Sequence, residues 1–245
     1  MSRSPQTVRN EVQSNGEAIE CMSWEEEQSI RPGRRANFSA VARFITFEGL
    51  DGSGKSTHLR AAAAWFAARG LPHLVTHEPG GTPLGRRVRE ILLDATTTPI
   101  PDVEALLFLA DRAQHLDEVI RPALAERRIV ISDRYQDSSL AYQSVGRGVG
   151  DLIPDVFRHI GGLTPDLTIL IDLDVEVALE RLRQRGASNR LDAEAPAFHE
   201  KVRRAFLDLA KAEPRRFEVF DGAVDVKTLS GRIAARLKER FGDLA

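Results

Sequence analysis

Short apolar segments alternate with segments of helical spacing along most of the chain, beginning at Arg43. The apolar segments are rich in β-branched and aromatic residues, which favours strands. They predict strands over residues 44–47, 74–76, 129–131, 167–173 and 217–220. Helical spacing predicts helices over residues 56–69, 83–93, 101–116, 175–185, 198–210 and 226–240. Apolar strands that alternate with helices imply a parallel sheet covered on both faces.

The helix that begins at Pro101 continues toward Glu126, with a break expected near Pro122 because proline lacks the backbone donor. Residues 1–40 differ in pattern: they are polar, and their apolar residues are sparse and aperiodic. Such a segment buries too little apolar surface to offset its ordering entropy. We therefore expect residues 1–40 to be a disordered N-terminal extension and residues 41–245 to be one domain. A natural start further along, for example at Met22, stays open.

Charge and composition narrow the class of protein. The chain has 245 residues, a net charge of -2 and a pI near 6.3. Proteins that hold nucleic-acid polymers usually carry a strongly basic domain, so we expect no such partner. No apolar run reaches the roughly 18 residues of a membrane helix, and no secretory signal stands at the N-terminus. A single cysteine forbids an intramolecular disulfide. We expect a cytoplasmic protein with no membrane partner.

The strongest chemical motif follows the first predicted strand. It fits the pattern G-x-x-x-x-G-K-[ST], in which backbone N–H groups cradle phosphates and a helix N-terminus adds positive charge. Lysine reaches the β- and γ-phosphates, and the Ser56 hydroxyl can ligate Mg²⁺. We therefore predict that Mg²⁺-ATP binds the residues Gly49, Leu50, Asp51, Gly52, Ser53, Gly54, Lys55 and Ser56.

A second candidate site follows the strand over 129–131. Asp133 lies where ligands bind in open α/β sheets, and it can hold Mg²⁺ or its water shell. The adjacent Arg134 offers a two-pronged donor for a phosphate. A purely structural ion pair between Asp133 and Arg134 is the alternative.

Three motifs give the chain a specific resemblance. The stretch D-R-Y-x-x-S-S-x-A-Y-Q from Asp133, E-P-G-G-T from Glu78 and L-F-L-A-D-R from Leu107 resemble, in order and spacing, the signature of thymidylate kinases. The resemblance covers about residue 43 to the C-terminus. It implies a P-loop NTPase fold with a five-stranded parallel sheet of strand order 2-3-1-4-5, a short LID, a homodimer packed through helices near Phe108, and transfer of phosphate from ATP to dTMP.

The resemblance also implies roles in the acceptor site. Phe108 would stack on thymine, Arg112 would donate to the base O4, and Arg134 would grip the phosphate. Ser139 and Tyr142 would line the floor, and Asp51 would contact the 3′-OH. The dTMP-binding set is thus Asp51, Glu78, Phe108, Arg112, Arg134, Ser139, Tyr142 and Gln143. From spacing alone, Phe108 and Tyr142 could instead be core residues and Arg112 a surface cation.

The remaining charge would come from the LID. Position 52 is glycine, so the phosphate loop has no arginine of its own. Arg181, Arg183, Arg185 and Arg190 surround a glycine-containing loop, where a LID could supply cations to the transition state. The predicted catalytic set is Asp51, Lys55, Arg134, Arg185 and Arg190. A solvated helix end is the alternative for the arginine cluster.

Two positions depart from the family pattern, and two other functions stay open. His77 stands where bacterial members would have arginine, and Asp192 stands where glutamate would follow the LID. Another deoxynucleoside or nucleoside monophosphate kinase is one alternative function. A P-loop switch protein is the non-enzymatic alternative, although the guanine-reading N-K-x-D motif is absent from the sequence.

Overall fold

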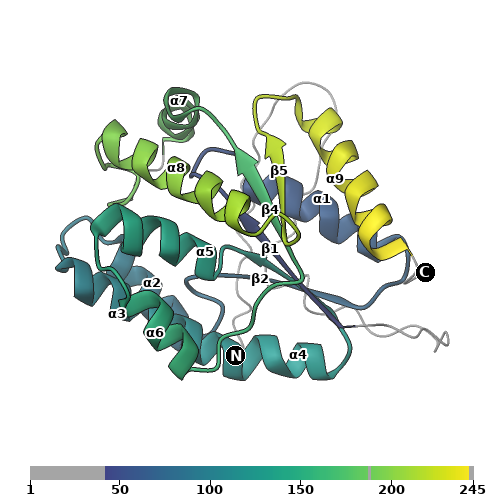
Figure 1. The fold of residues 1–245 in the computed structure, drawn as a ribbon, viewed down its shortest axis with the longest axis horizontal. Helices are drawn as coiled ribbons and strands as arrows, with labels where there is room; N and C mark the ends of the chain where they lie inside the picture. The colour runs from purple at the N-terminus through teal and green to yellow at the C-terminus, as the bar shows by residue number, and fades with distance from the viewer. Residues whose placement is uncertain (1–41, 187–188, 243–245) are drawn as a thin grey trace, which may run out of the picture. The chain divides into compact units, whose positions relative to one another are not determined.

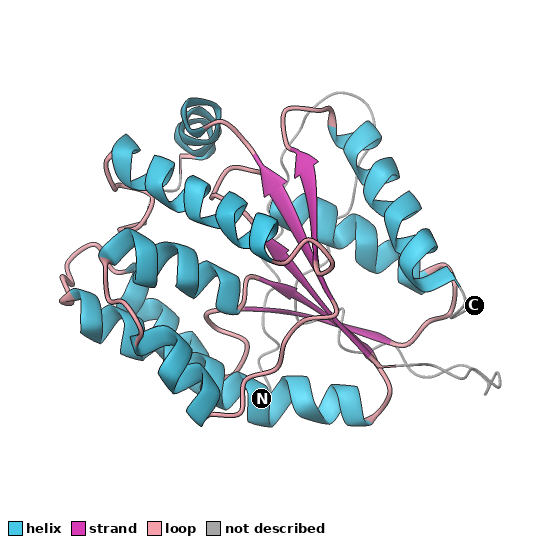
Figure 2. Ribbon diagram, viewed as in Figure 1, coloured by secondary structure: helices cyan, strands magenta, loops and turns pink. Residues whose placement is uncertain are grey.

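The computed structural model describes residues 42–186 and 189–242. Within them, five parallel strands form one sheet in the order β2-β3-β1-β4-β5, which confirms the predicted topology. The strands are β1 (Arg43–Glu48), β2 (His73–His77), β3 (Ile129–Asp133), β4 (Leu167–Asp172) and β5 (Phe217–Asp221). Helices lie on both sides of this sheet (Figures 1 and 2).

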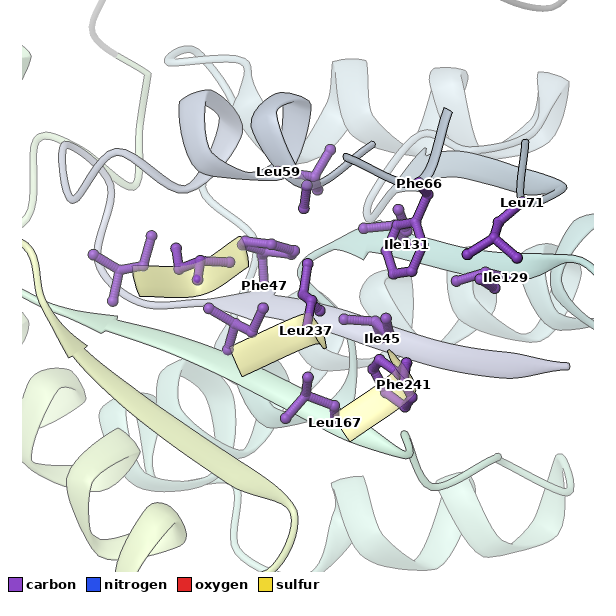
Figure 3. Packing of buried hydrophobic residues seen from close by; sticks show 14 of the residues in the cluster. Ile45, Phe47, Leu59, Phe66, Leu71, Ile129, Ile131, Leu167, Leu237 and Phe241 are labelled. Carbon is purple, nitrogen blue, oxygen red and sulfur yellow. The ribbon is translucent and has the colours of Figure 1, made fainter. Parts of the chain in front are cut away.

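Helices α1 (Lys55–Ala67) and α9 (Val226–Phe241) cover one face of the sheet. Alternate side chains of a strand point to opposite faces, and on β1 it is Ile45 and Phe47 that point toward these two helices. There they pack with Phe66 and Leu237, all fully buried (Figure 3). This apolar layer fixes β1, and with it the loop that follows β1.

The opposite face is covered by several helical segments, some of which pack in smaller clusters with Phe44, Val130 and Leu170. They are α2 (Pro83–Leu93), α3 (Pro101–His115), η2 (Leu116–Ile120), α4 (Arg121–Ala125), α5 (Gln136–Ser139), η3 (Leu140–Arg147), α6 (Leu152–His159) and α8 (Pro196–Ala212). A further helix, α7 (Val175–Arg185), follows β4.

Polar side chains also lie on this second face. Thr46 on β1 bonds Thr168 on β4 across 2.9 Å, and both are fully buried. Asp137 bonds Thr168 at 3.3 Å and forms an ion pair with Arg216 at 2.6 Å. Because these buried groups satisfy one another, the start of α5 is held against the first residues of β4 and the residue before β5.

Two helical regions lie where the sequence pattern predicted none: residues 136–147 and α6. The first is rich in Ser and Gln and ends near glycines, so its intrinsic helix signal is weak. Packing supplies the rest, since Tyr142 lies edge-on to Phe206 of α8 at 6.1 Å between ring centroids. The helix from Pro101 runs on to Ala125 as predicted, but its hydrogen-bond pattern changes at η2, before Pro122.

The predicted extension over residues 1–40 lies outside the described residues. In the described part of the chain, no helix is long and apolar enough to cross a membrane.

Candidate active site

The phosphate loop joins β1 to α1. Gly49, Gly52 and Gly54 have φ angles of 136°, 83° and 98°, which favour glycine. A Cβ on Gly49 would lie 2.4 Å from the Ile171 carbonyl oxygen, and a Cβ on Gly52 would lie 2.4 Å from that of Ala178. Backbone atoms cannot yield cheaply, so α7 leaves no room for any side chain at position 52. This is the physical reason why the loop carries no arginine there.

The Lys55 side chain is buried inside this loop. Its Nζ donates to the carbonyl oxygens of Gly49 at 3.1 Å and Leu50 at 2.9 Å, and it lies 3.4 Å from Asp51 Oδ1. Burial and the nearby Arg134 charge lower the Lys55 pKa, against the opposite pull of Asp51. The loop backbone therefore fixes the amine beside the turn that would surround a phosphate.

Ser56 and Asp133 meet at the start of α1. The Ser56 hydroxyl donates to Asp133 Oδ2 at 2.7 Å. In the described ranges no three His, Cys, Asp or Glu side chains gather as a metal cluster. Two oxygen ligands beside a phosphate loop nevertheless suit Mg²⁺, which takes one or two protein ligands and completes its shell with water and phosphate oxygens. The predicted metal pair is thus adjacent and chemically suitable.

Arg134 connects the phosphate loop to the segment after β3. Its φ of 69° lies in the left-handed region, which is strained for a residue with a side chain. Nη2 donates to Asp51 at 2.8 Å, and Nη1 donates to Ser138 Oγ at 2.8 Å. The guanidinium also lies 5.1 Å from the centre of the Tyr142 ring. Although burial opposes ionisation of Asp51, the charges of Arg134 and Lys55 outweigh it and lower its pKa.

One pocket opens beside this ion pair. Its lining includes all eight residues that the sequence assigns to dTMP: Asp51, Glu78, Phe108, Arg112, Arg134, Ser139, Tyr142 and Gln143. Pro79, Arg89, Leu93, Ser138, Asn189 and Leu191 complete it. Asp51 belongs both to the phosphate loop and to the pocket, so a group bound in the pocket lies next to a nucleotide bound by the loop.

Arg112 is a buried pocket residue and not a surface cation, because only 1% of it is exposed. Its Nε donates to Glu78 at 2.8 Å, and the other Glu78 oxygen contacts His115 Nδ1 at 2.8 Å. His115 in turn contacts Thr76 at 2.6 Å. Within the described residues Arg112 Nη1 is buried and has no hydrogen-bond partner. The network fixes the guanidinium through its Nε and leaves Nη1 without a protein partner.

The arginines around the end of α7 point to different places. Arg190 pairs with Glu104 of α3 at 2.7 Å and donates to the Leu92 carbonyl at 3.2 Å, and its neighbours Asn189 and Leu191 line the pocket. Arg185 is exposed at the last residue of α7. Arg181, which the sequence analysis grouped with them but did not select, donates to the Gly52 carbonyl at 3.5 Å and to that of Gly222 at 3.2 Å.

Comparison with known proteins identifies the family. The thymidylate kinase family model matches residues 47–233. The chain is 48% identical to the thymidylate kinase of Carboxydothermus hydrogenoformans, over 74% of this chain and 89% of that relative. It is 48% identical to that of Deinococcus radiodurans, over 80% of this chain and 97% of that relative. A crystal structure of thymidylate kinase from Ehrlichia chaffeensis matches with a TM-score of 0.66 and 34% identity, covering 80% of this chain and 98% of that one.

The chain belongs to the thymidylate kinase family. The resemblance predicted from its three motifs is therefore confirmed, and with it the P-loop NTPase fold and the class of enzyme. His77 stands where the family pattern has arginine. Burial and the Arg89 charge lower the pKa of His77, which favours a neutral imidazole.

Sequence reasoning did not select four polar residues that hold this site together. They are Glu48, Glu104, Ser138 and Arg181, of which Ser138 lies in a quoted motif and Arg181 in the arginine cluster at the end of α7. Glu48 directly precedes the phosphate loop at the end of a strand, and that position was the one signal that could have revealed it. The other three become visible only through contacts with residues distant in the sequence.

Glu48 holds the segment that follows Arg134 through hydrogen bonds. It is fully buried, and it accepts hydrogen bonds from the Tyr135 N–H at 2.8 Å and from Ser138 Oγ at 2.6 Å. Burial and the neighbouring Asp137 carboxylate raise the pKa of Glu48 to about 8. Because this is above the ordinary value of 4.5, the folded protein holds a proton that the unfolded chain has lost between these two pH values.

Glu48 should therefore reduce the free energy of unfolding as the pH rises from about 5 to about 9. Glu48→Gln removes this ionisation, so the stability difference between wild type and variant should shift in favour of the variant as the pH rises. Urea unfolding of both proteins across this range measures the difference. Parallel stability curves would show that Glu48 does not titrate in this way.

Proposed function

We propose that the protein transfers the terminal phosphate of ATP to dTMP and releases ADP and dTDP. The observation that carries this proposal is the shared position of Asp51, which lines the acceptor pocket while belonging to the phosphate loop. Membership of the thymidylate kinase family supports the same reaction.

On the donor side, the loop N–H groups and Lys55 would bind the ATP phosphates. Ser56 and Asp133 would hold Mg²⁺, which when bound neutralises charge on the phosphate oxygens. Arg181 bonds the carbonyl of Gly52 and so links α7 to the loop. The acceptor phosphate is already a nucleophile, so the protein mainly positions two anions and offsets their repulsion.

On the acceptor side, the Arg134 guanidinium would donate bidentate hydrogen bonds to the dTMP phosphate. Ser138 and Asp51 hold this guanidinium in place. Phe108 would stack on the base, and the unpartnered Nη1 of Arg112 would donate to O4 of thymine. Tyr142 would crowd a 2′-hydroxyl and so favour a deoxyribose.

The segment between α7 and α8 would act as a LID. Arg185 is the exposed cation at the end of α7 and would supply charge to the transferring phosphoryl group. Arg190 lies on the acceptor side in this structure, where Glu104 binds it. Arg190 could share the phosphate role only if that ion pair opens.

The homodimer that the family resemblance implies would use the face formed by α2 and α3. Five large apolar side chains are exposed on or next to these helices: Leu84, Ile91, Ile100, Val103 and Leu106, with exposed fractions of 47%, 47%, 64%, 43% and 48%. A second copy of the chain would cover these side chains. Phe108, near which the resemblance places the dimer contact, lies on α3. Cytoplasmic location stays a prediction from the sequence.

Acceptor choice tests the proposed reaction directly. We expect rapid ADP formation with dTMP and little with dCMP, dGMP or thymidine. Thymidine lacks the phosphate that Arg134 would bind, and dCMP presents an amino donor to Arg112. A coupled assay of ADP release with each acceptor provides the measurement. Equal rates with dGMP and dTMP would contradict the proposal.

The LID is tested by Arg185→Ala. An arginine that acts mainly in the transition state should lower kcat by about a hundredfold or more when it is removed, with a much smaller change in KM. Arg183→Ala is the matched control, since Arg183 is an exposed arginine of the same helix and, among the residues that the structure describes, its guanidinium pairs only with Glu180, at 2.7 Å. Unchanged kcat in Arg185→Ala would move the catalytic charge elsewhere.

A further inference from the structure

Glu104 is a buried carboxylate on which three side chains from two other segments converge. It lies in the first turn of α3 and is 1% exposed. Gln143 Nε2 donates to its Oε1 at 3.0 Å. Arg147 donates to Oε1 at 3.2 Å and to Oε2 at 3.3 Å, and Arg190 donates to Oε2 at 2.7 Å.

These donors keep Glu104 ionised. Burial opposes the charge, but the hydrogen bonds from Gln143, Arg190 and Arg147 outweigh it and lower the pKa. An ionised carboxylate can only accept hydrogen bonds. The Gln143 amide must therefore turn its nitrogen toward Glu104 and its oxygen away from it.

The Gln143 oxygen is available to a ligand. Gln143 is 2% exposed and lines the acceptor pocket together with Arg112. No hydrogen bond from another described residue reaches its Oε1. The pocket is thus lined by an amide that Glu104 holds and by a guanidinium that Glu78 holds, whose Nη1 has no hydrogen-bond partner among the described residues.

We propose that Glu104 is the positioning residue that sets the base preference, because it fixes the Gln143 amide with its oxygen toward the base. This inference rests on the proposed dTMP site. Thymine and uracil carry an N3–H donor beside the O4 acceptor, and they match the pair formed by Gln143 and Arg112. Cytosine carries an N3 acceptor beside an N4 amino donor, and it opposes both groups.

Glu104 also holds Arg190, which belongs to the segment after α7. The Glu104 oxygen that Arg190 bonds is not the one that holds Gln143. Asn189 and Leu191, on either side of Arg190, line the acceptor pocket. Base reading and the placement of the segment after α7 therefore depend on one carboxylate.

Glu104→Gln tests the proposal. In this variant the new amide oxygen would face the two arginines, and its NH₂ group would face Gln143 and make it turn over. The ratio of kcat/KM for dTMP to that for dCMP should fall by about tenfold to a hundredfold, as expected when a buried group loses its match. The value for dUMP should fall with that for dTMP, because both bases carry N3–H. A merely structural role would lower all three acceptors together, and that result would overturn the proposal.

Glu194→Gln is the matched control. Glu194 pairs with Arg147 at 2.6 Å but does not contact Gln143, so the ratio should stay as in wild type. Gln143→Ala provides a second test. This variant alone should lower the ratio of kcat/KM for dTMP to that for dCMP, and adding Glu104→Gln should not change the ratio further. If Glu104→Gln does not fold, an unchanged ratio in Gln143→Ala overturns the proposal. Failure of the wild type to phosphorylate dTMP would instead refute the proposed function.

Discussion

The ion pair between Arg134 and Asp51 is the interaction on which the site depends. It joins the phosphate loop to the segment after β3, across 2.8 Å, and so holds the loop beside the pocket that we propose for the acceptor. Arg134 reaches Asp51 from a left-handed backbone conformation, which the surrounding structure has to maintain. Glu48 supplies that support, because it binds the Tyr135 N–H and, through Ser138, the Arg134 side chain.

The sheet provides the rigid frame for this ion pair. Since β1 and β3 are neighbours and parallel, the phosphate loop and Arg134 leave the sheet at the same edge. Apolar packing against α1 and α9 fixes one face, and the buried Thr46, Thr168 and Asp137 cluster fixes the other near the site. The helical layer beyond Arg134 then carries the two groups that we propose read the base: Arg112 is held by Glu78, and Gln143 is held by Glu104.

Sequence patterns were informative where a structure depends on nearby residues. The strands could be predicted from apolar runs and the phosphate loop from its glycines, whereas the strand order came from the family resemblance. The helices over 136–147 and α6 could not be predicted from the sequence pattern, because tertiary packing stabilises them more than the helix propensity of their own residues does. Glu104 was equally hidden: its partners Gln143 and Arg190 lie 39 and 86 positions away, and no local pattern reports such a contact.

A double-mutant cycle on Asp51 and Arg134 tests most directly whether their ion pair unites the two halves of the site. The measurement is kcat/KM for dTMP in wild type, Asp51→Asn, Arg134→Lys and the double variant. If the two side chains act as one unit, kcat/KM of the double variant should be only slightly lower than that of the less active single variant. The coupling free energy between the two positions should then be about 0.5–3 kcal/mol. Losses that simply multiply would show that Asp51 and Arg134 act independently and would contradict this account.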